Sequence, residues 1–259
     1  MTPQEQVDAL LVFQGGHADE DELIAAGVVE VRAYRGAADH ISDVYEVELE
    51  SGRCAYFKPT NGPYAQRTPA LRAMASYGHT LMSMTISECA AWQLARRLGP
   101  PWEALIAPTV LRFLALPGRG REVGSLSLAQ QGRDRQRGFF QAVPEQVSSG
   151  AFFDMLVGQQ DRNLGNILWD ERARCIHLID HAFTFGLPGR PTGELALSVW
   201  RWQHGSRDLA EAEARALRDL VVDDLHGLGS FVEPERAAAL KRRAETMIET
   251  RRALRPGIL

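Results

Sequence analysis

The sequence predicts an α+β protein in which a β-rich N-terminal part is followed by a mostly helical C-terminal part. Three observations support this prediction. Between Val28 and Leu128, several short segments alternate apolar and polar residues, the period of a half-buried strand. One long helical pattern, 85–99, interrupts these segments. From residue 148 onward, apolar residues recur mainly at helical spacing, apart from one short hairpin.

Composition places the chain among ordinary globular proteins. It has 259 residues, 45% of them hydrophobic and 24% charged, with a formal net charge of −4. This balance argues against bulk nucleic-acid binding, which usually requires a basic excess, although a local basic face remains possible. No apolar run approaches the roughly 20 residues of a membrane-spanning helix, and the first residues lack a basic signal-peptide region. We therefore expect a cytoplasmic protein without a transmembrane segment.

The cysteines and histidines show no metal-binding motif along the sequence. Cys54, Cys89 and Cys175 are scattered and form no C-x-x-C pair, which suits a reducing compartment and predicts no zinc site. Each lies in an apolar context, so we expect all three to be small buried side chains. The spacing of three histidines is not typical of metal ligands, and we expect a structural role for them: His177, His181 and His204.

The N-terminal part begins with two predicted helices and a meander of three strands. Helical spacing predicts the first helix over Pro3–Val12 and a shorter one over Asp19–Ala26. Alternating residues then predict antiparallel strands over 29–34, 44–49 and 53–58. A polar loop is expected over 60–77.

A strong helix and two further strands complete the expected N-terminal part. The helix is predicted over Thr85–Gly99, with Thr85 or Ser87 as its cap, and Gly99 followed by two prolines ends it. Strands are predicted over 108–116 and 123–128, joined by a turn at 118–121.

The C-terminal part is expected to be helical around one hairpin. A helix over 148–159 leads to a polar loop, followed by strands at 167–169 and 176–179 with a turn at 170–173. Three helical segments follow, at 194–204, 209–225 and 234–254.

Three polar residues around this hairpin carry the candidate chemistry. Asn166 and Asp180 flank the hairpin, so a tight pairing brings their oxygens to neighbouring strand ends. Hard oxygen ligands suit Mg²⁺, which binds one or two carboxylates together with substrate phosphates. We then expect Asp161, just upstream, to face a substrate hydroxyl. This arrangement is what phosphoryl transfer needs, whereas the alternative is a polar loop with solvated turn residues.

The motif Asp161-Arg162-Asn163-x-x-Asn166 with Ile179-Asp180-His181 resembles the catalytic loop and metal motif of the kinase-like superfamily. The similarity is to the phosphoinositide 3-/4-kinase type and bacterial HipA-like kinases, because Arg162 follows the aspartate instead of preceding it. His181-Ala182 stands where that family often has Phe-Gly. The resemblance covers roughly 28–185 and implies a two-lobe fold, with an N-lobe over 1–128 and a C-lobe over 129–259.

The resemblance also implies roles for residues upstream of the hairpin. Lys58 would bind the α- and β-phosphates of ATP, with Glu88 holding it in an ion pair. The alternatives are a solvated edge lysine and a glutamate that favours the helix dipole. The loop 36–42 would cover the phosphates and the segment 129–132 would face adenine, which makes these residues cofactor-binding candidates: Ala37, Ala38, Ser42 and Gln130.

The expected function is Mg²⁺- and ATP-dependent transfer of a phosphoryl group to a hydroxyl of a protein or small molecule. Arg162 would steady the loop or the γ-phosphate. Two alternatives stay open: transfer of AMP on the same fold, and a nucleotide-binding module without catalysis. A third class, a helical interaction protein, would leave the ordered polar set unexplained.

Five arginines are clustered along the sequence, and they form either a solvated face or a site for an anionic acceptor: Arg119, Arg121, Arg133, Arg135 and Arg137.

Overall fold

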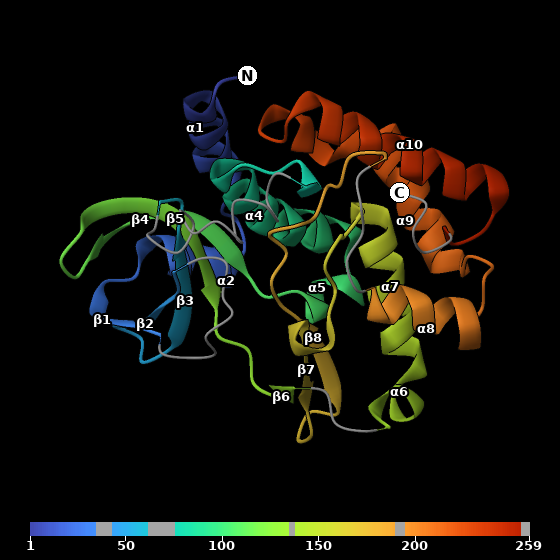
Figure 1. The fold of residues 1–259 in the computed structure, drawn as a ribbon, viewed down its shortest axis with the longest axis horizontal. Helices are drawn as coiled ribbons and strands as arrows, with labels where there is room; N and C mark the ends of the chain where they lie inside the picture. The colour runs from blue at the N-terminus through green and yellow to red at the C-terminus, as the bar shows by residue number, and fades with distance from the viewer. Residues whose placement is uncertain (35–42, 62–75, 135–137, 190–194, 255–259) are drawn as a thin grey trace.

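The computed structural model describes residues 1–34, 43–61, 76–134, 138–189 and 195–254. Its N-terminal half contains a five-stranded antiparallel sheet with the strand order β1-β2-β3-β5-β4. Figure 1 shows this sheet at one end of the molecule and the C-terminal helices at the other. The strands are β1 (Val28–Ala33), β2 (Tyr45–Leu49), β3 (Cys54–Pro59), β4 (Thr109–Leu116) and β5 (Gly120–Leu128). The predicted meander and the later strand pair are both present.

Helices cover both faces of this sheet. On one face, Leu23 of α2 (Ala18–Ala25) packs with alternate strand residues such as Val47, Phe57 and Leu126 in a single buried cluster. On the other face, Leu111 of β4 is buried together with residues of α4 (Leu81–Leu98). The intervening residues of β3, among them Lys58, therefore face the same side as α4.

Helix α4 begins earlier than the sequence predicted. Thr80 caps it: its hydroxyl accepts a hydrogen bond from the Ser83 backbone N–H at 3.1 Å, and the Ser83 hydroxyl accepts one from Thr80 N–H at 2.8 Å. The prediction of a cap at Thr85 or Ser87 is therefore wrong. Thr85 already lies inside the helix and donates to the Leu81 carbonyl. The predicted end at Gly99 is confirmed, because this residue takes the positive φ that stops the helix.

The C-terminal part is built from helices around a small sheet. Strands β6 (Arg133–Asp134), β7 (Ile167–Asp170) and β8 (Cys175–Leu178) pair in that order, which confirms the predicted hairpin. The helices around them are α5 (Trp102–Leu105), α6 (Phe139–Ala142), α7 (Pro144–Val157), α8 (Ala196–His204), α9 (Glu211–Val222) and α10 (Pro234–Thr250), with 3-10 segments η1 (Leu164–Asn166) and η2 (Asp224–Ser230). Helix α1 (Pro3–Phe13) precedes all of these.

The largest hydrophobic core runs across both halves of the sequence. It contains Leu10 of α1 and Leu94 of α4 together with Phe152 of α7, Leu217 of α9 and Leu240 of α10. Figure 1 shows α4 between the sheet and the C-terminal helices. The N-terminal helices thus share their core with the C-terminal ones, and the division into lobes at 128/129 stays a prediction.

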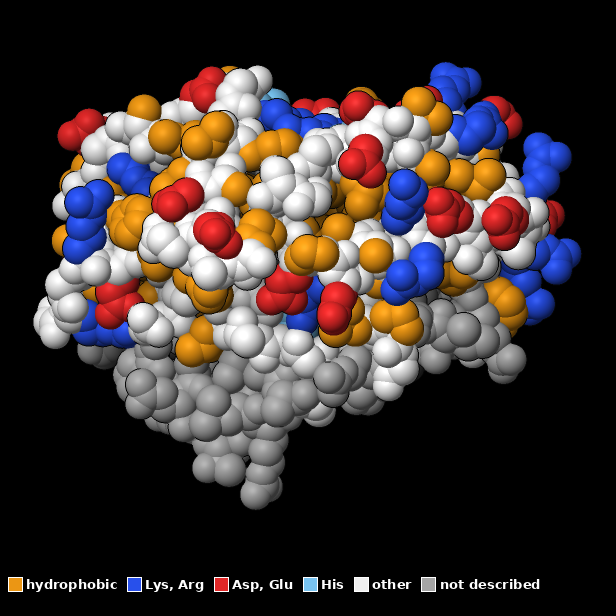
Figure 2. Space-filling view, turned by 90° about the horizontal axis from the view of Figure 1, so that it is seen from above, with side chains coloured by type: hydrophobic (Ala, Val, Ile, Leu, Met, Phe, Trp, Pro, Cys, Tyr) orange, Lys and Arg blue, Asp and Glu red, His pale blue; other side chains and the backbone are white. Residues whose placement is uncertain are grey.

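The surface and the cysteines give two further results. In the view of Figure 2, acidic and basic side chains are interspersed with apolar ones, the ordinary pattern of a solvated surface. Within the described ranges, no helix is long and apolar enough to span a membrane. The prediction of three buried cysteines is wrong for Cys54, which is exposed at the first position of β3, and for Cys175, which is only half-buried, while Cys89 is buried.

Candidate active site

Lys58 and Glu88 form a direct ion pair between the sheet and helix α4. The Lys58 Nζ lies 2.5 Å from Glu88 Oε1. Strand β3 directs Lys58 toward α4 by its alternation, and the helical position of Glu88 turns its carboxylate back toward the sheet. The Glu88 side chain is only 5% exposed, so the pair lies largely out of solvent. Lys58 is therefore not the solvated edge lysine of the alternative interpretation.

Asp180 joins this pair from the far end of the hairpin. Its Oδ1 lies 2.9 Å from Lys58 Nζ, while its side chain stays 41% exposed. Burial opposes the charge on Lys58, but Asp180 and Glu88 outweigh burial and raise the pKa of Lys58 above its usual value. Burial would raise the pKa of Asp180, but the Lys58 charge lowers it to about 2. Lys58 and Asp180 are accordingly charged near neutral pH.

Helix α4 is also bonded to the segment that follows Asp180. The second oxygen of Glu88, Oε2, accepts a hydrogen bond from the His181 backbone N–H at 2.9 Å. The preceding residue, Ser87, donates its hydroxyl proton to the Thr184 carbonyl at 3.3 Å. Glu88 therefore binds Lys58 and the 180–184 segment at once, and burial raises its pKa although Lys58 opposes this shift.

The hairpin register places Asn166 and Asp180 at adjoining strand ends. Ile167 is opposite Leu178, and the Ile179 N–H donates to the Asn166 carbonyl at 3.1 Å. The Asn166 amide Nδ2 donates to the Asp161 carbonyl at 3.2 Å, which leaves its Oδ1 as an acceptor. The backbone of Asp180 adopts a positive φ of 59°, which is unusual for a non-glycine residue and often found at functional sites.

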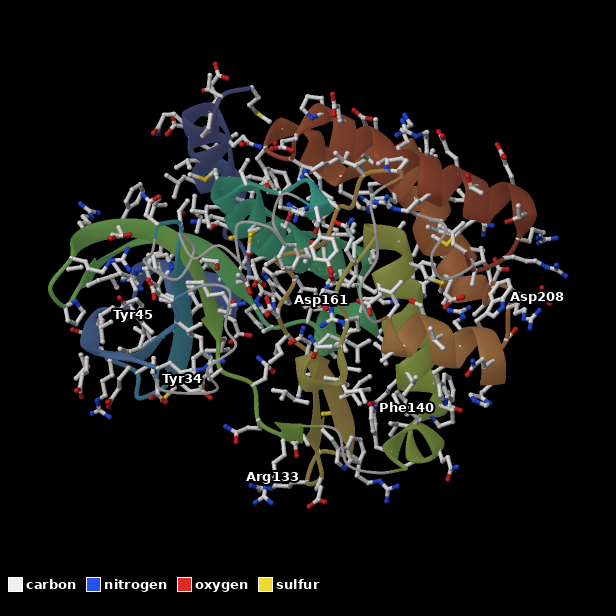
Figure 3. The ribbon with its side chains drawn as sticks, in the orientation of Figure 1. Tyr34, Tyr45, Arg133, Phe140, Asp161 and Asp208 are labelled. Atoms are coloured by element: carbon white, nitrogen blue, oxygen red, sulfur yellow. The ribbon has the colours of Figure 1, made fainter. Side chains whose placement is uncertain are left out.

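Asp161 lies in the middle of the molecule, between the sheet and the C-terminal helices, as Figure 3 shows. Gln159 holds its backbone: Gln159 Oε1 accepts from the N–H groups of Gln160 and Asp161 at 2.9 and 3.1 Å. The same side chain donates Nε2 to the Asp180 carbonyl at 3.3 Å. A buried glutamine thus links the loop that carries Asp161 to the residue proposed for metal binding.

Arg162 lies in the protein interior and not beside the proposed phosphate site. Its side chain is completely buried, and its Nε and Nη2 bind both oxygens of Asp154 on α7, at 3.0 and 3.1 Å. Its Nη1 donates to the carbonyls of Asn166 and Ile179 at 3.1 and 2.5 Å. With its side chain buried and its donors bound in this way, Arg162 is not placed to contact a γ-phosphate. The loop-steadying alternative fits, and the prediction of Arg162 as a catalytic residue is corrected to a positioning role.

Other predicted binding residues lie elsewhere or outside the described part of the chain. Ala37, Ala38 and Ser42 fall within 35–42, which the structure does not describe. Gln130 lies in the connection between β5 and β6, where its side chain donates to the Leu128 carbonyl at 3.3 Å. Its backbone remains the proposed adenine partner.

Among the described residues of the arginine cluster, Arg119 and Arg121 already have partners. Arg119 lies 2.8 Å from the carboxylates of both Asp43 and Glu122, so its charge is already balanced. Arg121 stacks over the Phe113 ring at 5.3 Å, and Arg135 and Arg137 lie outside the described residues. An open hollow of about 400 Å³ occurs beside α10, but none of the predicted site residues lines it.

Sequence reasoning missed the residues that support this site. Gln159 and Asp154 hold the loop, yet neither belongs to the recognised motif, and no role was expected for the His181 backbone, which binds Glu88. The available signal was the position of two polar residues, Asp154 and Gln159, in an otherwise apolar helical stretch. Buried polar side chains need partners, so such residues mark a bonded network.

The oxygen donors of this site fit a small hard cation. A carboxylate from Asp180 and an amide oxygen from Asn166 are the kind of set that binds Mg²⁺ with phosphate oxygens. Lys58 provides the positive charge beside them. The set is therefore chemically suited to a metal-bound polyphosphate.

The fold resembles that of solved kinase structures at low sequence identity. A crystal structure of the Golgi casein kinase is 13% identical, with a TM-score of 0.53 over 96% of this chain and 76% of that one. The same kinase with Mn/ADP bound is 14% identical, with a TM-score of 0.52 and the same coverage. The Helicobacter pylori proinflammatory kinase CtkA, 11% identical over 89% of this chain and 94% of its own, has a TM-score of 0.40 and is too distant to inform the fold. No protein-family model matches the sequence, and no curated protein does. The similarity to the two Golgi casein kinase structures supports a kinase-like fold.

Proposed function

We propose that this protein is a Mg²⁺- and ATP-dependent phosphotransferase of the atypical kinase type, related to the phosphoinositide 3-/4-kinase and HipA-like kinases. The observation that carries the proposal is the contact of Lys58 with both Glu88 and Asp180. These residues come from a strand, a helix and a hairpin that are far apart in the sequence. A kinase active site requires such a lysine, held by one acid and adjacent to a metal-binding acid.

In this proposal each residue has one task. Lys58 binds the α- and β-phosphates, and Glu88 orients Lys58. Asn166 and Asp180 hold Mg²⁺, which would neutralise charge on the phosphates. Asp161 accepts or orients the proton of the attacking hydroxyl, and Gln159 keeps its backbone in place. The buried ion pair of Arg162 and Asp154 connects the loop that carries Asp161 to helix α7.

The presence of an acid at position 161 favours catalysis over nucleotide binding alone. A module that only binds nucleotide needs Lys58 and Asp180, but it has no need for a second acid on a loop tied to the metal-binding residue. Here Gln159 and Asn166 fix the backbone on both sides of that acid. We expect the acceptor to be a hydroxyl of a protein or a small molecule.

The decisive experiment uses ATP labelled at the α- or the γ-phosphate, with Mg²⁺ and the full-length protein. Release of ADP with transfer of the γ-label, to water or to an added acceptor, supports the proposal. Transfer of the α-label indicates AMP transfer instead. Binding of ATP in a thermal-shift assay without either product indicates a silent module.

Asp161→Asn tests the assigned base. We expect turnover to fall by about 10²-fold or more, because general base catalysis contributes about that much. The affinity for Mg²⁺-ATP should stay unchanged, since Asp161 is not assigned to the nucleotide. The control is Asp208→Asn, at an acid that Figure 3 shows far from Asp161. Near-normal turnover by Asp161→Asn would remove this residue from its role.

A further inference from the structure

Three side chains that can bind metals lie together at the turn end of the β7–β8 hairpin. Asp170 and Cys175 are partners across the two strands, and His177 follows two residues later on the same face of β8. One ligand atom from each of the three lies within 4.8 Å of the other two. All three residues are partly exposed, so an ion has access to them.

The distance between two of these atoms suits a bound ion. Cys175 Sγ and His177 Nε2 are 3.4 Å apart. A tetrahedral zinc ion lies about 2.3 Å from sulfur and about 2.0 Å from imidazole nitrogen, which separates two such ligands by roughly 3.5 Å. The hairpin therefore already holds these two atoms at the spacing of a zinc site.

The third residue has an oxygen to spare. Asp170 Oδ1 accepts the backbone N–H groups of Arg172 and Ala173 at 2.8 and 2.9 Å, which shapes the hairpin turn. This turn role accounts for one carboxylate oxygen and leaves the other for an ion. The Asp170 carboxylate and the Cys175 thiolate each carry one negative charge. Together they balance the charge of one divalent cation.

The imidazole of His177 has the surroundings of a metal ligand. Its Nε2 faces Cys175, and its Nδ1 is buried without a hydrogen bond of normal geometry. The polar group beside the ring is the backbone of Ala104 in α5, next to the bridge between Ile106 and Leu178. Metal-bound histidines usually direct their second nitrogen at such a backbone group, which sets the ring orientation.

We propose that Asp170, Cys175 and His177 form a binding site for a divalent ion of the zinc type, with water as the fourth ligand. Mixed sulfur, nitrogen and oxygen donors favour Zn²⁺ over Mg²⁺ or Ca²⁺. On binding, the Cys175 S–H bond breaks, its proton passes to water and the sulfur binds the ion. The site joins β7 to β8 at one end of the hairpin, whereas Asn166 and Asp180 lie at the other end, roughly 13 Å along the strands.

The test is a titration of the full-length, chelator-treated protein with Co²⁺ alone, followed by Zn²⁺. We expect one equivalent of Co²⁺ to bind, with a thiolate-to-cobalt charge-transfer band and visible bands of tetrahedral intensity, and Zn²⁺ to remove both. Excess Mg²⁺ should leave them unchanged. The control variants Cys54→Ser and Asp180→Asn should bind Co²⁺ like the wild type, because one removes an exposed cysteine elsewhere and the other alters the proposed magnesium site.

Variants at the three ligands decide the outcome. Cys175→Ser should lose the charge-transfer band, and His177→Gln and Asp170→Asn should bind Co²⁺ at least tenfold more weakly. Asp170→Asn keeps the oxygen that accepts the turn N–H groups, so it tests the charge without breaking the hairpin. Circular dichroism in chelator verifies that each variant is folded. Absence of the band in the wild type, or wild-type binding by any folded ligand variant, overturns the proposal.

Discussion

Arg162 and Asp154 form an ion pair that is completely enclosed by the protein. Both side chains are at most 1% exposed, and burial raises the pKa of Asp154 while the Arg162 charge opposes this shift. The guanidinium also binds the backbone at the open end of the hairpin, through the carbonyls of Asn166 and Ile179. At the scale of the single residue, Arg162 therefore fixes the loop that carries Asp161 to the end of the strand that precedes Asp180.

Arg162→Ala should destabilise the protein by about 3–5 kcal/mol, because it leaves the Asp154 carboxylate buried without a partner. The double variant Arg162→Met with Asp154→Leu should recover a large part of this loss, since no buried charge remains. Urea unfolding of the wild type, of Arg162→Ala and of the double variant measures these differences. Arg207→Ala serves as the control, because Arg207 stacks on Trp202 at the surface. Wild-type stability of Arg162→Ala would contradict the assigned role.

His79 provides a prediction of pH dependence. Burial lowers its pKa from 6.5 to about 3, and the nearby Arg236 charge adds to this effect. Between these two values the unfolded chain binds a proton that the folded protein does not, so the free energy of unfolding falls as the pH is lowered. At pH 5, about 1.5 units below the ordinary pKa of histidine, His79 alone should lower the free energy of unfolding by about 2 kcal/mol.

Urea unfolding at pH 7 and pH 5 measures this loss, and His79→Gln should reduce the difference between the two conditions. The glutamine amide can replace the ring as partner of Gln160 Oε1, which lies 3.2 Å from His79 Nε2. An equal pH dependence in the wild type and the variant would show that His79 is not the group responsible.

At the scale of elements, helix α4 is held in place from outside the site. Glu20 of α2 is completely buried and accepts hydrogen bonds from Trp92, Gln93 and Arg96 of α4. Burial raises the pKa of Glu20, and these partners oppose that shift. Helix α2 thereby sets the rotation of α4, and with it the direction of Glu88 toward Lys58.

Strands β3 and β5 set the position of Lys58 in a similar way. Gly124 of β5 is paired with Pro59 of β3, and a Cβ atom at Gly124 would lie 2.8 Å from the Pro59 Cα and also meet the Lys58 carbonyl. This contact is with backbone, which cannot move without shifting the strand. The absence of a side chain at Gly124 is therefore part of how Lys58 reaches the site.

Gly124→Ala should destabilise the protein by about 1–3 kcal/mol through overpacking, and should weaken ATP binding by displacing β3. Thermal unfolding and nucleotide titration measure the two effects. The matched control is Gly229→Ala, where a new Cβ meets no atom within 4 Å and φ is not in the left-handed region. Equal behaviour of the two variants would show that the strand tolerates the added methyl group.

At the scale of the whole molecule, the shared hydrophobic core joins the two predicted lobes. Leu10 and Leu94 from the N-terminal half are completely buried with Phe152 and Leu240 from the C-terminal half. Unfolding either half alone would expose this common interior to water, at a cost that scales with the apolar area.

We therefore expect a single calorimetric unfolding transition, with a calorimetric enthalpy equal to the van't Hoff enthalpy. Differential scanning calorimetry of the full-length protein measures both. Two resolved transitions, one of which shifts in Gly124→Ala while the other does not, would show that the sheet unfolds as a separate unit.

Much of the architecture follows from local patterns. Period-two alternation predicted the five strands of the larger sheet, and helical spacing predicted most helices, including the end of α4 at Gly99. The start of α4 was misjudged because Thr80 and Ser83 cap it through a mutual pair of hydrogen bonds, while a later threonine and serine gave a competing signal. The order of Asp161, Asn166 and Asp180 around a hairpin identified the candidate site.

The sequence by itself determined the strands, the helices and the polar residues available for chemistry, because periodicity and turn residues act over a few neighbouring positions. Only the tertiary structure decided that Lys58 contacts Glu88 and Asp180, and that Arg162 is buried against Asp154. The tertiary structure also brought Asp170 beside Cys175 and His177. The spacing of these residues along the chain had not indicated a metal-binding site. Such contacts depend on strand register and on which surfaces the core covers, and these are set by packing between segments distant in sequence.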